Sequence, residues 1–343
     1  MSQHFIENIK IENFKCFENL EINDFKRVNV FGGKNNVGKT ALLEAIELLT
    51  TSNELMILIY HVHRLLERRQ SSTKKIDLDL FRRDSMSSPL HKSFSIESLS
   101  MSRHEKISIS KDFQKDIGYS IMFSIGDEGI GISPDVFDKT FYYESRDSQY
   151  RKPVVSSYFV KSSGIDGDEV SSIYGVVIEC GKEVFLDNSI NKFDPSFLSF
   201  RIILTESGII PKIKMNGRDE FIPISEMGEG IGRYIAILCA IWASQDGFLF
   251  IDEIENGIHY SNYKKLWELI FMASEQANCQ VFVTSHSKEC IEAFNNVQQE
   301  RNDDTGRYFE LYRSEKKQRI VAAVRDAEQL HYSLTHGAAI RGE

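Results

Sequence analysis

Cysteine is scarce in this sequence of 343 residues, and no two cysteines lie close together in the chain. The five cysteines are scattered, with no CxxC pair, at Cys16, Cys180, Cys239, Cys279 and Cys290. A disulfide framework would need a regular set of them. Hydrophobic residues make up 41% of the chain and charged residues 27%, as in ordinary globular proteins with a sizeable core. We therefore exclude a disordered, collagenous or disulfide-stapled chain and expect reduced, mostly buried thiols.

Long apolar runs and an excess of positive charge are also missing. The longest apolar run, Ile235 to Ala243, has nine residues, less than half of a membrane-spanning helix. The opening segment MSQHFIENIK lacks the apolar core of a signal peptide. Because 50 acidic residues outnumber 41 basic ones, any nucleic acid would have to bind a local patch. These absences predict a soluble, cytoplasmic protein with no membrane contact.

The pattern of polar and apolar residues divides the chain into three parts. In residues 1–61, apolar residues alternate with polar ones and then recur at helical spacing, which predicts short strands, a glycine-rich loop and an amphipathic helix. Residues 62–170 differ, because 62–92 hold eight Lys and Arg against four Asp and Glu and a Ser-rich, weakly periodic stretch follows. We predict an inserted arm or subdomain there. Residues 171–343 return to alternating strands and helices, which indicates a parallel sheet covered on both faces.

The third part carries further predicted elements. Strands are expected in IYGVVIEC (173–180), FRIILTE (200–206) and 209–224, with a hairpin turn at Asn216-Gly217. After them we expect a helix from about 225, a strand at 248–251, a helix at 261–276 and a strand at 281–283. The segment YFELYRSEKKQRIVAAV predicts a hairpin, and a short helix follows it.

The segment GKNNVGKT (33–40) matches the phosphate-binding pattern GxxxxGK[ST]. It follows a predicted strand and opens a predicted helix, as this motif requires. Glycines let backbone N–H groups curl around phosphate oxygens, and the helix N-terminus adds a positive dipole end. Lys39 would reach the β- and γ-phosphates of ATP, and the Thr40 hydroxyl would bind Mg²⁺. We assign nucleotide binding to Gly33, Asn35, Asn36, Gly38, Lys39, Thr40 and Ala41.

The apolar strand FLFI (248–251) ends in the acidic pair Asp252 and Glu253. In open α/β sheets, ligands bind at the carboxyl ends of the strands. We expect Asp252 to hold Mg²⁺ and Glu253 to polarise the attacking water as a general base. An apolar run ending in two acids is common by itself, so this assignment depends on the phosphate loop in the same chain.

Two further segments complete the candidate site. SEMGEGIGR (225–233) opens a helix with glycines, which makes a second anion site. Because residues 33–40 already hold the phosphates, Gly228 and Gly230 would contact a nucleotide bound by another subunit; a simple helix-capping turn is the alternative. His286 ends the next predicted strand, beside the sheet edge that holds the phosphates, and is assigned a catalytic role.

In this order, the motifs resemble those of ATP-binding-cassette-type (ABC-type) ATPases. The branch is the one that contains RecF, the structural-maintenance-of-chromosomes (SMC) proteins and the OLD (overcoming lysogenization defect) family. IKIENFKCFENLEI is similar to its first strands and GGKNNVGKTALLEAI to its Walker A motif. FLFIDEIENGIHY resembles its Walker B motif and D-loop, and VFVTSHSKECIEAF its His switch. The greatest similarity is to stand-alone bacterial OLD-like ATPases, over about 1–60 and 200–343.

The resemblance implies an ABC-type head fold: a mixed or parallel sheet with flanking helices, an N-terminal antiparallel part and an insert. It also implies a homodimer, or a higher even oligomer, that encloses ATP, in which Gly228 and Gly230 of one subunit face the γ-phosphate held by Lys39 and Thr40 of the other. OLD nucleases carry a metal-binding TOPRIM domain after the ATPase. Here the predicted hairpin and helix occupy the residues after His286, so any nuclease would be another chain. Asp77 and Asp79 in the insert form a DxD pattern without a placed partner glutamate.

Three functions are compatible with this sequence. The first is a Mg²⁺-dependent ATPase that dimerises around ATP and gates a separate effector, a nuclease or toxin, in bacterial anti-phage defence. The second is a RecF-like repair or recombination ATPase that clamps DNA with the basic segment 62–92, which could also contact RNA or be plain solvated surface. The third is a scaffold that uses ATP without hydrolysis, against which Glu253 argues, because a scaffold needs no general base.

Overall fold

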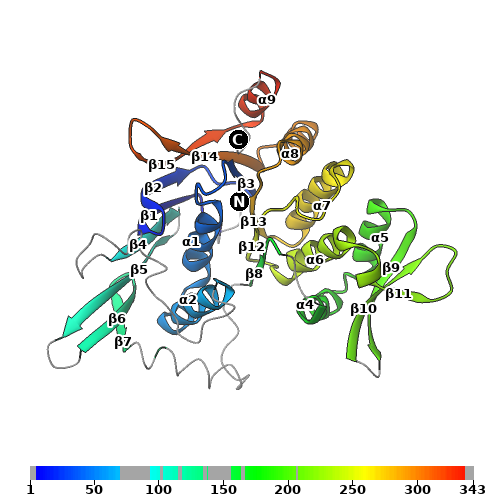
Figure 1. Cartoon of the computed structure of the whole chain (residues 1–343), viewed down its shortest axis with the longest axis horizontal. Coiled ribbons are helices and arrows are strands. Elements are labelled where there is room, and N and C mark those ends of the chain that lie inside the picture. Colours follow the sequence, from blue (N-terminus) through cyan, green and yellow to red (C-terminus); the bar gives the residue numbers. More distant parts are fainter. Residues whose placement is uncertain are drawn as a thin grey trace.

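The computed structural model describes residues 5–69, 93–100, 103–114, 118–133, 137, 156–163, 167–205 and 208–336. These parts form three β-sheets with helices between and around them, as Figure 1 shows. A six-stranded mixed sheet lies in the middle, with a six-stranded antiparallel sheet on one side and a three-stranded sheet on the other. The chain therefore has a mixed α/β fold.

The central sheet contains the strands that carry the predicted motifs. Its order is β15-β14-β3-β13-β12-β8, and all neighbours are parallel except β15 and β14. The strands are β3 (Val28–Gly33), β8 (Ser157–Val160), β12 (Phe248–Ile251), β13 (Gln280–Thr284), β14 (Gly306–Ser314) and β15 (Arg319–Arg325). Because β3, β13 and β12 are parallel neighbours, their carboxyl ends lie at one edge of the sheet. The phosphate loop, Asp252 and His286 follow these ends.

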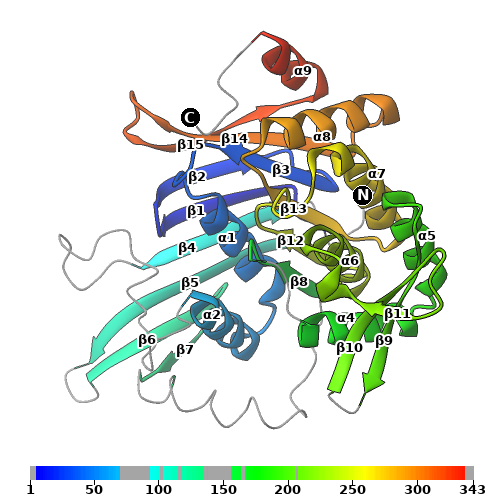
Figure 2. The ribbon, with the colours of Figure 1, turned by 45° about the vertical axis from the view of Figure 1, so that its right-hand side comes forward.

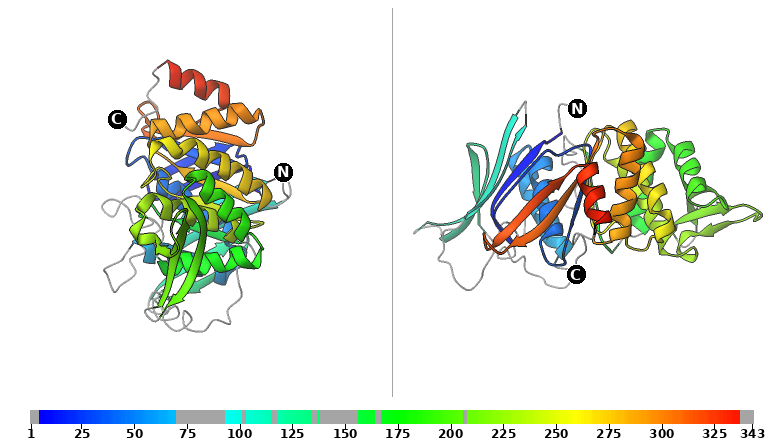
Figure 3. Two further views of the ribbon diagram at one scale, coloured as in Figure 1. Left: turned by 90° about the vertical axis from the view of Figure 1, so that its right-hand side faces the viewer. Right: turned by 90° about the horizontal axis from the view of Figure 1, so that it is seen from above.

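Helix α1 (Lys39–Thr51), which follows the phosphate loop, lies between the central and antiparallel sheets (Figure 3, right). All of its residues except Thr40 are buried, as expected for a helix enclosed on every side. The central sheet presents a row of phenylalanines to α1: Phe31 stacks on Phe282, which stacks on Phe250, which stacks on Phe159. Helix α2 (Leu55–Arg69) packs beside α1.

The antiparallel sheet includes residues that were predicted to form an inserted subdomain. Its strands, in the order β2-β1-β4-β5-β6-β7, are β1 (Asn8–Phe14), β2 (Phe17–Asn23), β4 (Phe94–Ser100), β5 (Arg103–Gln114), β6 (Gly118–Ile125) and β7 (Glu128–Ile132). Strand β4 pairs with β1, and β8 pairs with β12 in the central sheet. The described strands of 62–170 thus complete the two large sheets, which differs from the predicted boundaries. Local periodicity does not show pairing between segments so far apart in sequence.

Helices cover the face of the central sheet that points away from α1 (Figure 2). They are α6 (Glu229–Ala243), α7 (Tyr263–Gln276) and α8 (Lys288–Arg301), with the short turn η3 (Tyr260–Asn262) before α7. Helices α4 (Gly167–Glu179) and α5 (Glu183–Phe193) pack against α6 and the small sheet. Val281 and Val283 of β13 pack into this layer, whereas Phe282 between them faces α1. The strand is therefore buried on both faces, which explains its continuous apolar sequence.

The prediction of a strand at 173–180 is wrong, because these residues lie in or just after α4. Val170, Ile173, Tyr174 and Val177 are buried, while Ile178 is exposed. Their spacing of three and four residues places them on one helix face, which packs against α6. The β-branched residues of IYGVVIEC favour a strand by propensity, but burial along the helical period decides the structure.

The remaining elements follow the sequence-based expectations more closely. The small sheet contains β9 (Phe197–Thr205), β10 (Gly208–Met215) and β11 (Phe221–Pro223), and Gly217 in the β10–β11 loop has φ +73°. The hairpin at Asn216-Gly217 is confirmed, with a loop longer than two residues. The hairpin β14–β15 and the final helix α9 (Ala327–Thr335) are also confirmed. From β11 the chain passes through the turn η2 (Ile224–Glu226) to Gly228, the residue before α6.

All five cysteines are free thiols. Cys239, Cys279 and Cys290 are buried, and Cys16 and Cys180 are partly buried. The expected reduced, mostly buried cysteines are confirmed. Among the described residues, none of the helices has both the length and the apolar character needed to cross a membrane.

Candidate active site

The phosphate loop connects β3 to α1 and depends on two glycines. Gly33 has φ +132° and Gly38 has φ +89°, conformations that L side chains rarely adopt. A Cβ on Gly33 would overlap the Leu311 carbonyl oxygen, and one on Gly38 would overlap Cys16 Sγ. Backbone and β-sheet packing therefore both require glycine here. Asn35 and Asn36 are exposed in the loop between them, and Ala41 is buried in the first turn of α1.

The Lys39 side chain lies back along this loop and is only 8% exposed. Its Nζ donates to the carbonyl oxygens of Gly33 at 2.8 Å and Lys34 at 3.0 Å. Burial lowers the pKa of Lys39, while the nearby carboxylates of Glu255, Glu253 and Asp252 raise it. The ammonium group thus lies inside the curve of the loop, where phosphate oxygens would accept its hydrogen bonds.

Hydroxyl and carboxylate oxygens come together where α1, β12 and β13 meet. Thr40 Oγ1 lies 3.0 Å from Asp252 Oδ2, and Thr284 Oγ1 donates to Asp252 Oδ1 at 2.6 Å. Burial raises the pKa of Asp252, and the two hydroxyl hydrogen bonds oppose this rise. Mg²⁺ prefers such oxygen ligands, and a cation here would offset the burial of the carboxylate. The residues present therefore fit a magnesium ion held by Thr40 and Asp252.

Glu253 occupies a tight turn directly after Asp252. Its φ is +49°, an uncommon value for a non-glycine residue. Its backbone N–H donates to Thr284 Oγ1 at 2.8 Å, and its Oε2 accepts from Asn256 Nδ2 at 2.8 Å. Asn256 also donates to the Ser162 carbonyl at 3.2 Å. Thr284 of β13 thus fixes the backbone of Glu253, and Asn256 of the loop after β12 fixes its carboxylate.

Arg233 supports this turn from behind, reaching it from α6. Nη2 donates to the carbonyl oxygens of Asp252 at 2.7 Å and Glu253 at 2.8 Å. Nη1 donates to those of Lys161 at 2.9 Å and Ser162 at 3.2 Å. The guanidinium group is buried, and burial lowers its pKa against the effect of the neighbouring carboxylates. The helix that begins at the second glycine-rich stretch is therefore bonded directly to the acidic turn.

The second glycine-rich stretch lies at the start of α6, against the loop after β12. Gly228, the residue before the helix, has φ +84°, and a Cβ there would meet no atom within 4 Å. A Cβ on Gly230 would lie 2.6 Å from the Gly257 carbonyl oxygen. The structure thus places Gly228 and Gly230 beside the loop of Glu253–Gly257, with open space over Gly228.

His286 follows β13 and precedes α8. Its side chain is 41% exposed, and Nδ1 lies 2.9 Å from Oε1 of the buried Glu255. The same oxygen accepts from the backbone N–H groups of His286 at 2.7 Å and Ser287 at 3.2 Å. His286 thus stands at the same sheet edge as the phosphate loop and the acidic pair.

The structure reveals four polar residues of this site for which sequence reasoning gave no role: Arg233, Glu255, Asn256 and Thr284. All four lie inside or next to motifs recognised in the sequence. Arg233, Glu255 and Thr284 bond residues 19 to 32 positions away, and Asn256 bonds both the nearby Glu253 and the distant Ser162. In the sequence alone, these residues could have been noticed only as polar or charged positions within the motifs to which no role had been assigned.

The basic segment 62–92 is described only as far as the end of α2. Arg64 is exposed. Arg68 turns inward instead: its guanidinium pairs with Glu47 of α1 and lies 4.2 Å from the centre of the Phe159 ring. Arg68 therefore belongs to the packing of α2 and not to a surface patch. The pair Asp77 and Asp79 and the basic residues after Arg69 lie outside the described residues.

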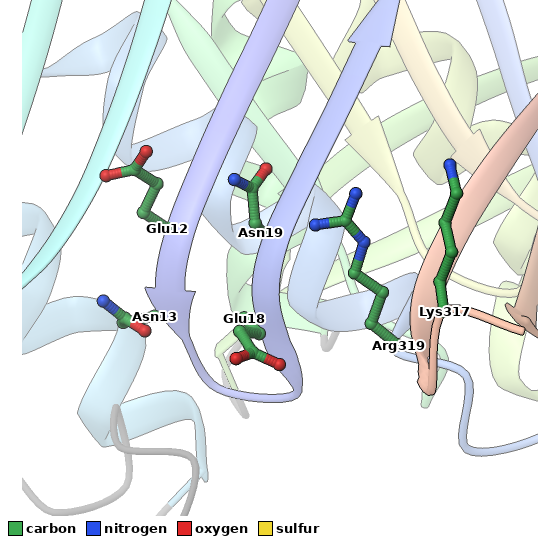
Figure 4. Close-up of a pocket in the computed structure, with 6 residues that line it drawn as sticks. All are labelled: Glu12, Asn13, Glu18, Asn19, Lys317 and Arg319. Atoms are coloured by element: carbon green, nitrogen blue, oxygen red, sulfur yellow. The ribbon is translucent and has the colours of Figure 1, made fainter.

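A concave surface with a volume of about 540 Å³ above it lies between the β1–β2 turn and the β14–β15 turn (Figure 4). Its lining mixes two acids, two amides and two bases: Glu12, Asn13, Glu18, Asn19, Lys317 and Arg319. The adjoining Cys16 and Phe17 pack against Gly38. This surface is therefore close to the phosphate loop, although none of the predicted site residues lines it.

Comparison with known proteins agrees with this geometry. Residues 5–159 match a family model described as an AAA ATPase domain. Residues 188–292 match a second AAA domain model, whose description carries a proposed link to the AbiEii toxin of a type IV toxin–antitoxin system. An ATP/GTP phosphatase of Helicobacter pylori is 25% identical over 339 residues, covering 87% of this chain and 89% of that protein.

Two solved SMC heads share the fold. The SMC head bound to the C-terminal winged-helix domain of ScpA has a TM-score of 0.55 at 14% identity, covering 94% of this chain and 99% of that one. An SMC head from Pyrococcus furiosus with an extended coiled coil, also bound to ScpA, has a TM-score of 0.52 at 15% identity, covering 97% and 99%. The expected ABC-type head fold is confirmed. The AAA models and the Helicobacter pylori relative support ATPase activity, and the SMC heads show the fold.

Proposed function

Starting from a P-loop ATPase with an SMC-head fold, we propose that the chain hydrolyses ATP with Mg²⁺ at the edge formed by β3, β12 and β13. Lys39 binds the β- and γ-phosphates, Thr40 and Asp252 hold Mg²⁺, and Glu253 acts as the general base for the attacking water. His286 contacts the γ-phosphate. The observation that carries this proposal is the oxygen cluster of Thr40, Asp252 and Thr284, which lies directly beside Glu253.

We propose further that ATP is enclosed between two copies of the chain. Gly228 has open space over it at the start of α6, and a helix N-terminus favours an anion. Arg233 of the same helix holds the turn of Asp252 and Glu253. A γ-phosphate from the partner subunit at Gly228 and Gly230 would thus be sensed at the catalytic turn of the same chain.

The biological role that we propose is control of a separate effector, a nuclease or toxin, in bacterial anti-phage defence. The toxin–antitoxin link of the second AAA model supports this direction, as does the resemblance to stand-alone OLD-like ATPases. The DNA-clamping alternative depended on the basic segment. Of the basic side chains in that segment, the structure describes Arg64, which is exposed, and Arg68, which is turned into the protein. DNA clamping is therefore kept as the second candidate role.

ATP titration of the Lys39→Ala variant tests the phosphate site. We expect calorimetry to show loss of ATP binding, because Lys39 is the cation inside the phosphate loop. Lys264→Ala, which removes an exposed lysine of α7, is the matched control and should bind ATP as the parent protein does. Micromolar affinity retained by Lys39→Ala would refute this site.

A further inference from the structure

The Glu255 carboxylate joins two parts of the active site. It lies in the loop after β12, and its side chain is 6% exposed. Three donor groups surround one of its oxygens, Oε1: the N–H of His286, the N–H of Ser287 and the ring Nδ1 of His286. One carboxylate oxygen thus holds both the backbone and the ring of the same histidine.

This contact determines how the imidazole ring is presented. A carboxylate only accepts hydrogen bonds, so Nδ1 must carry the hydrogen that lies between it and Oε1 at 2.9 Å. Nδ1 therefore points into the protein. Because Glu255 is buried and the ring is 41% exposed, the opposite nitrogen, Nε2, is at the open side of the ring. A carboxylate behind a histidine fixes ring orientation in this way in metal sites and catalytic triads.

The surroundings of Glu255 point to an electrostatic role beyond that of a loop tether. Among the carboxylates near the two buried cations Lys39 and Arg233, Glu255 does most to raise their pKa values against the effect of burial. Its second oxygen, Oε2, is buried and has no hydrogen-bond partner among the described residues. A tether for two N–H groups would need only a neutral acceptor, whereas this position holds a buried charge.

The geometry points to Glu255 as a positioning residue that holds the His286 ring with Nδ1 turned inward, so that Nε2 faces the γ-phosphate. This inference rests on the proposed contact between His286 and the γ-phosphate. Glu255 touches neither the nucleotide nor the metal itself. Its negative charge favours the hydrogen bond at Nδ1 and strengthens the ring as a partner for the phosphate.

Steady-state ATP hydrolysis by four variants tests this role: Glu255→Gln, His286→Ala, the double variant and Glu289→Gln. Glutamine keeps an oxygen for the two backbone N–H groups but removes the charge. We expect kcat of Glu255→Gln to fall by about 10- to 100-fold, with KM for ATP changed by less than about twofold. Glu289→Gln removes an exposed carboxylate at the start of α8 and should keep the parent kcat.

The double variant decides whether Glu255 acts through His286. If it does, the double variant should be as slow as His286→Ala alone and no slower. Multiplied losses, a parent-like kcat in Glu255→Gln, or an effect mainly on KM would overturn the inference. A slow His286→Ala beside a fast Glu255→Gln would refute only the positioning role. A His286→Ala variant with parent kcat would refute the contact of His286 with the γ-phosphate, and the positioning role with it.

Discussion

At the scale of single residues, the candidate site depends on buried charges that compensate one another. Lys39, Arg233, Asp252 and Glu255 are all buried, and each lies in the field of opposite charges or accepts several hydrogen bonds. Buried charges are tolerated only in such company. Removing one of them would leave the others uncompensated, which is why neutral variants of the same shape are the informative ones.

The sequence allowed some of these residues to be assigned roles and not others. Lys39, Thr40, Asp252 and Glu253 occur in contiguous patterns whose spacing reflects the chemistry of phosphates and Mg²⁺. Glu255 and Arg233 act through contacts with His286 and with the turn of Asp252, which lie in other segments. Such contacts depend on sheet order, so local spacing could not reveal them.

One buried histidine outside the site gives a prediction about pH. His61 of α2 is buried, and its pKa is lowered from 6.5 to about 4, first by burial and then by Arg68 and Arg64. Above pH 6.5 the ring is neutral in both the folded and the unfolded chain. As the pH falls below 6.5, the unfolded chain binds a proton that the folded protein refuses, so the protein loses stability.

Urea unfolding at pH 7 and pH 5 measures this effect. We expect the parent protein to lose about 2 kcal/mol more than His61→Phe between these pH values, from 1.36 kcal/mol for each pH unit below the unfolded pKa. His331→Gln, a change of an exposed histidine in α9, should behave as the parent does. Equal pH dependence in the parent and His61→Phe would contradict a neutral His61.

At the scale of secondary structure, strands and helices with clear periodicity were predicted well. The sequences of β12 and β13 are continuous apolar runs, and α1 shows helical spacing directly after the glycine-rich loop that follows β3. The structure confirms all of these elements. In 173–180, β-branched residues suggested a strand although the burial follows a helix. The pairing of β1 with β4 joins residues about 85 positions apart, and such pairing leaves no local pattern.

The link between α6 and the acidic turn gives an element-scale prediction. Arg233 bonds four carbonyl oxygens with a planar fork, which the single ammonium of lysine cannot reproduce. We expect Arg233→Lys to lower kcat for ATP by about 10- to 100-fold, the usual effect of losing support behind a metal ligand.

The control for this variant is Arg201→Lys. Arg201 pairs with Asp187 between β9 and α5, away from the nucleotide loop, and its replacement should leave kcat unchanged. Equal kcat values for Arg233→Lys and the parent protein would show that α6 does not support the catalytic turn.

At the scale of the whole molecule, the layers bring all predicted motifs to one edge. Helix α1 lies between the two large sheets, and β3, β12 and β13 end side by side. The second glycine-rich stretch begins α6, on the other face of the central sheet, and there is open space over Gly228. One chain thus presents a phosphate loop and, separately, a glycine-rich helix start, an arrangement that two copies could join around ATP.

The central claim, hydrolysis by Glu253 between two copies, is tested most directly by sedimentation velocity of Glu253→Gln with and without MgATP. Glutamine keeps the shape of the site but cannot accept the proton of water, so hydrolysis should slow by roughly 10²–10⁴-fold while ATP stays bound. We therefore predict an ATP-dependent shift to a dimer. Adding Gly228→Asp should abolish the shift through repulsion of the partner's γ-phosphate, whereas Gly228→Ala, which shares its backbone strain, should not. Identical sedimentation with and without MgATP would contradict the account.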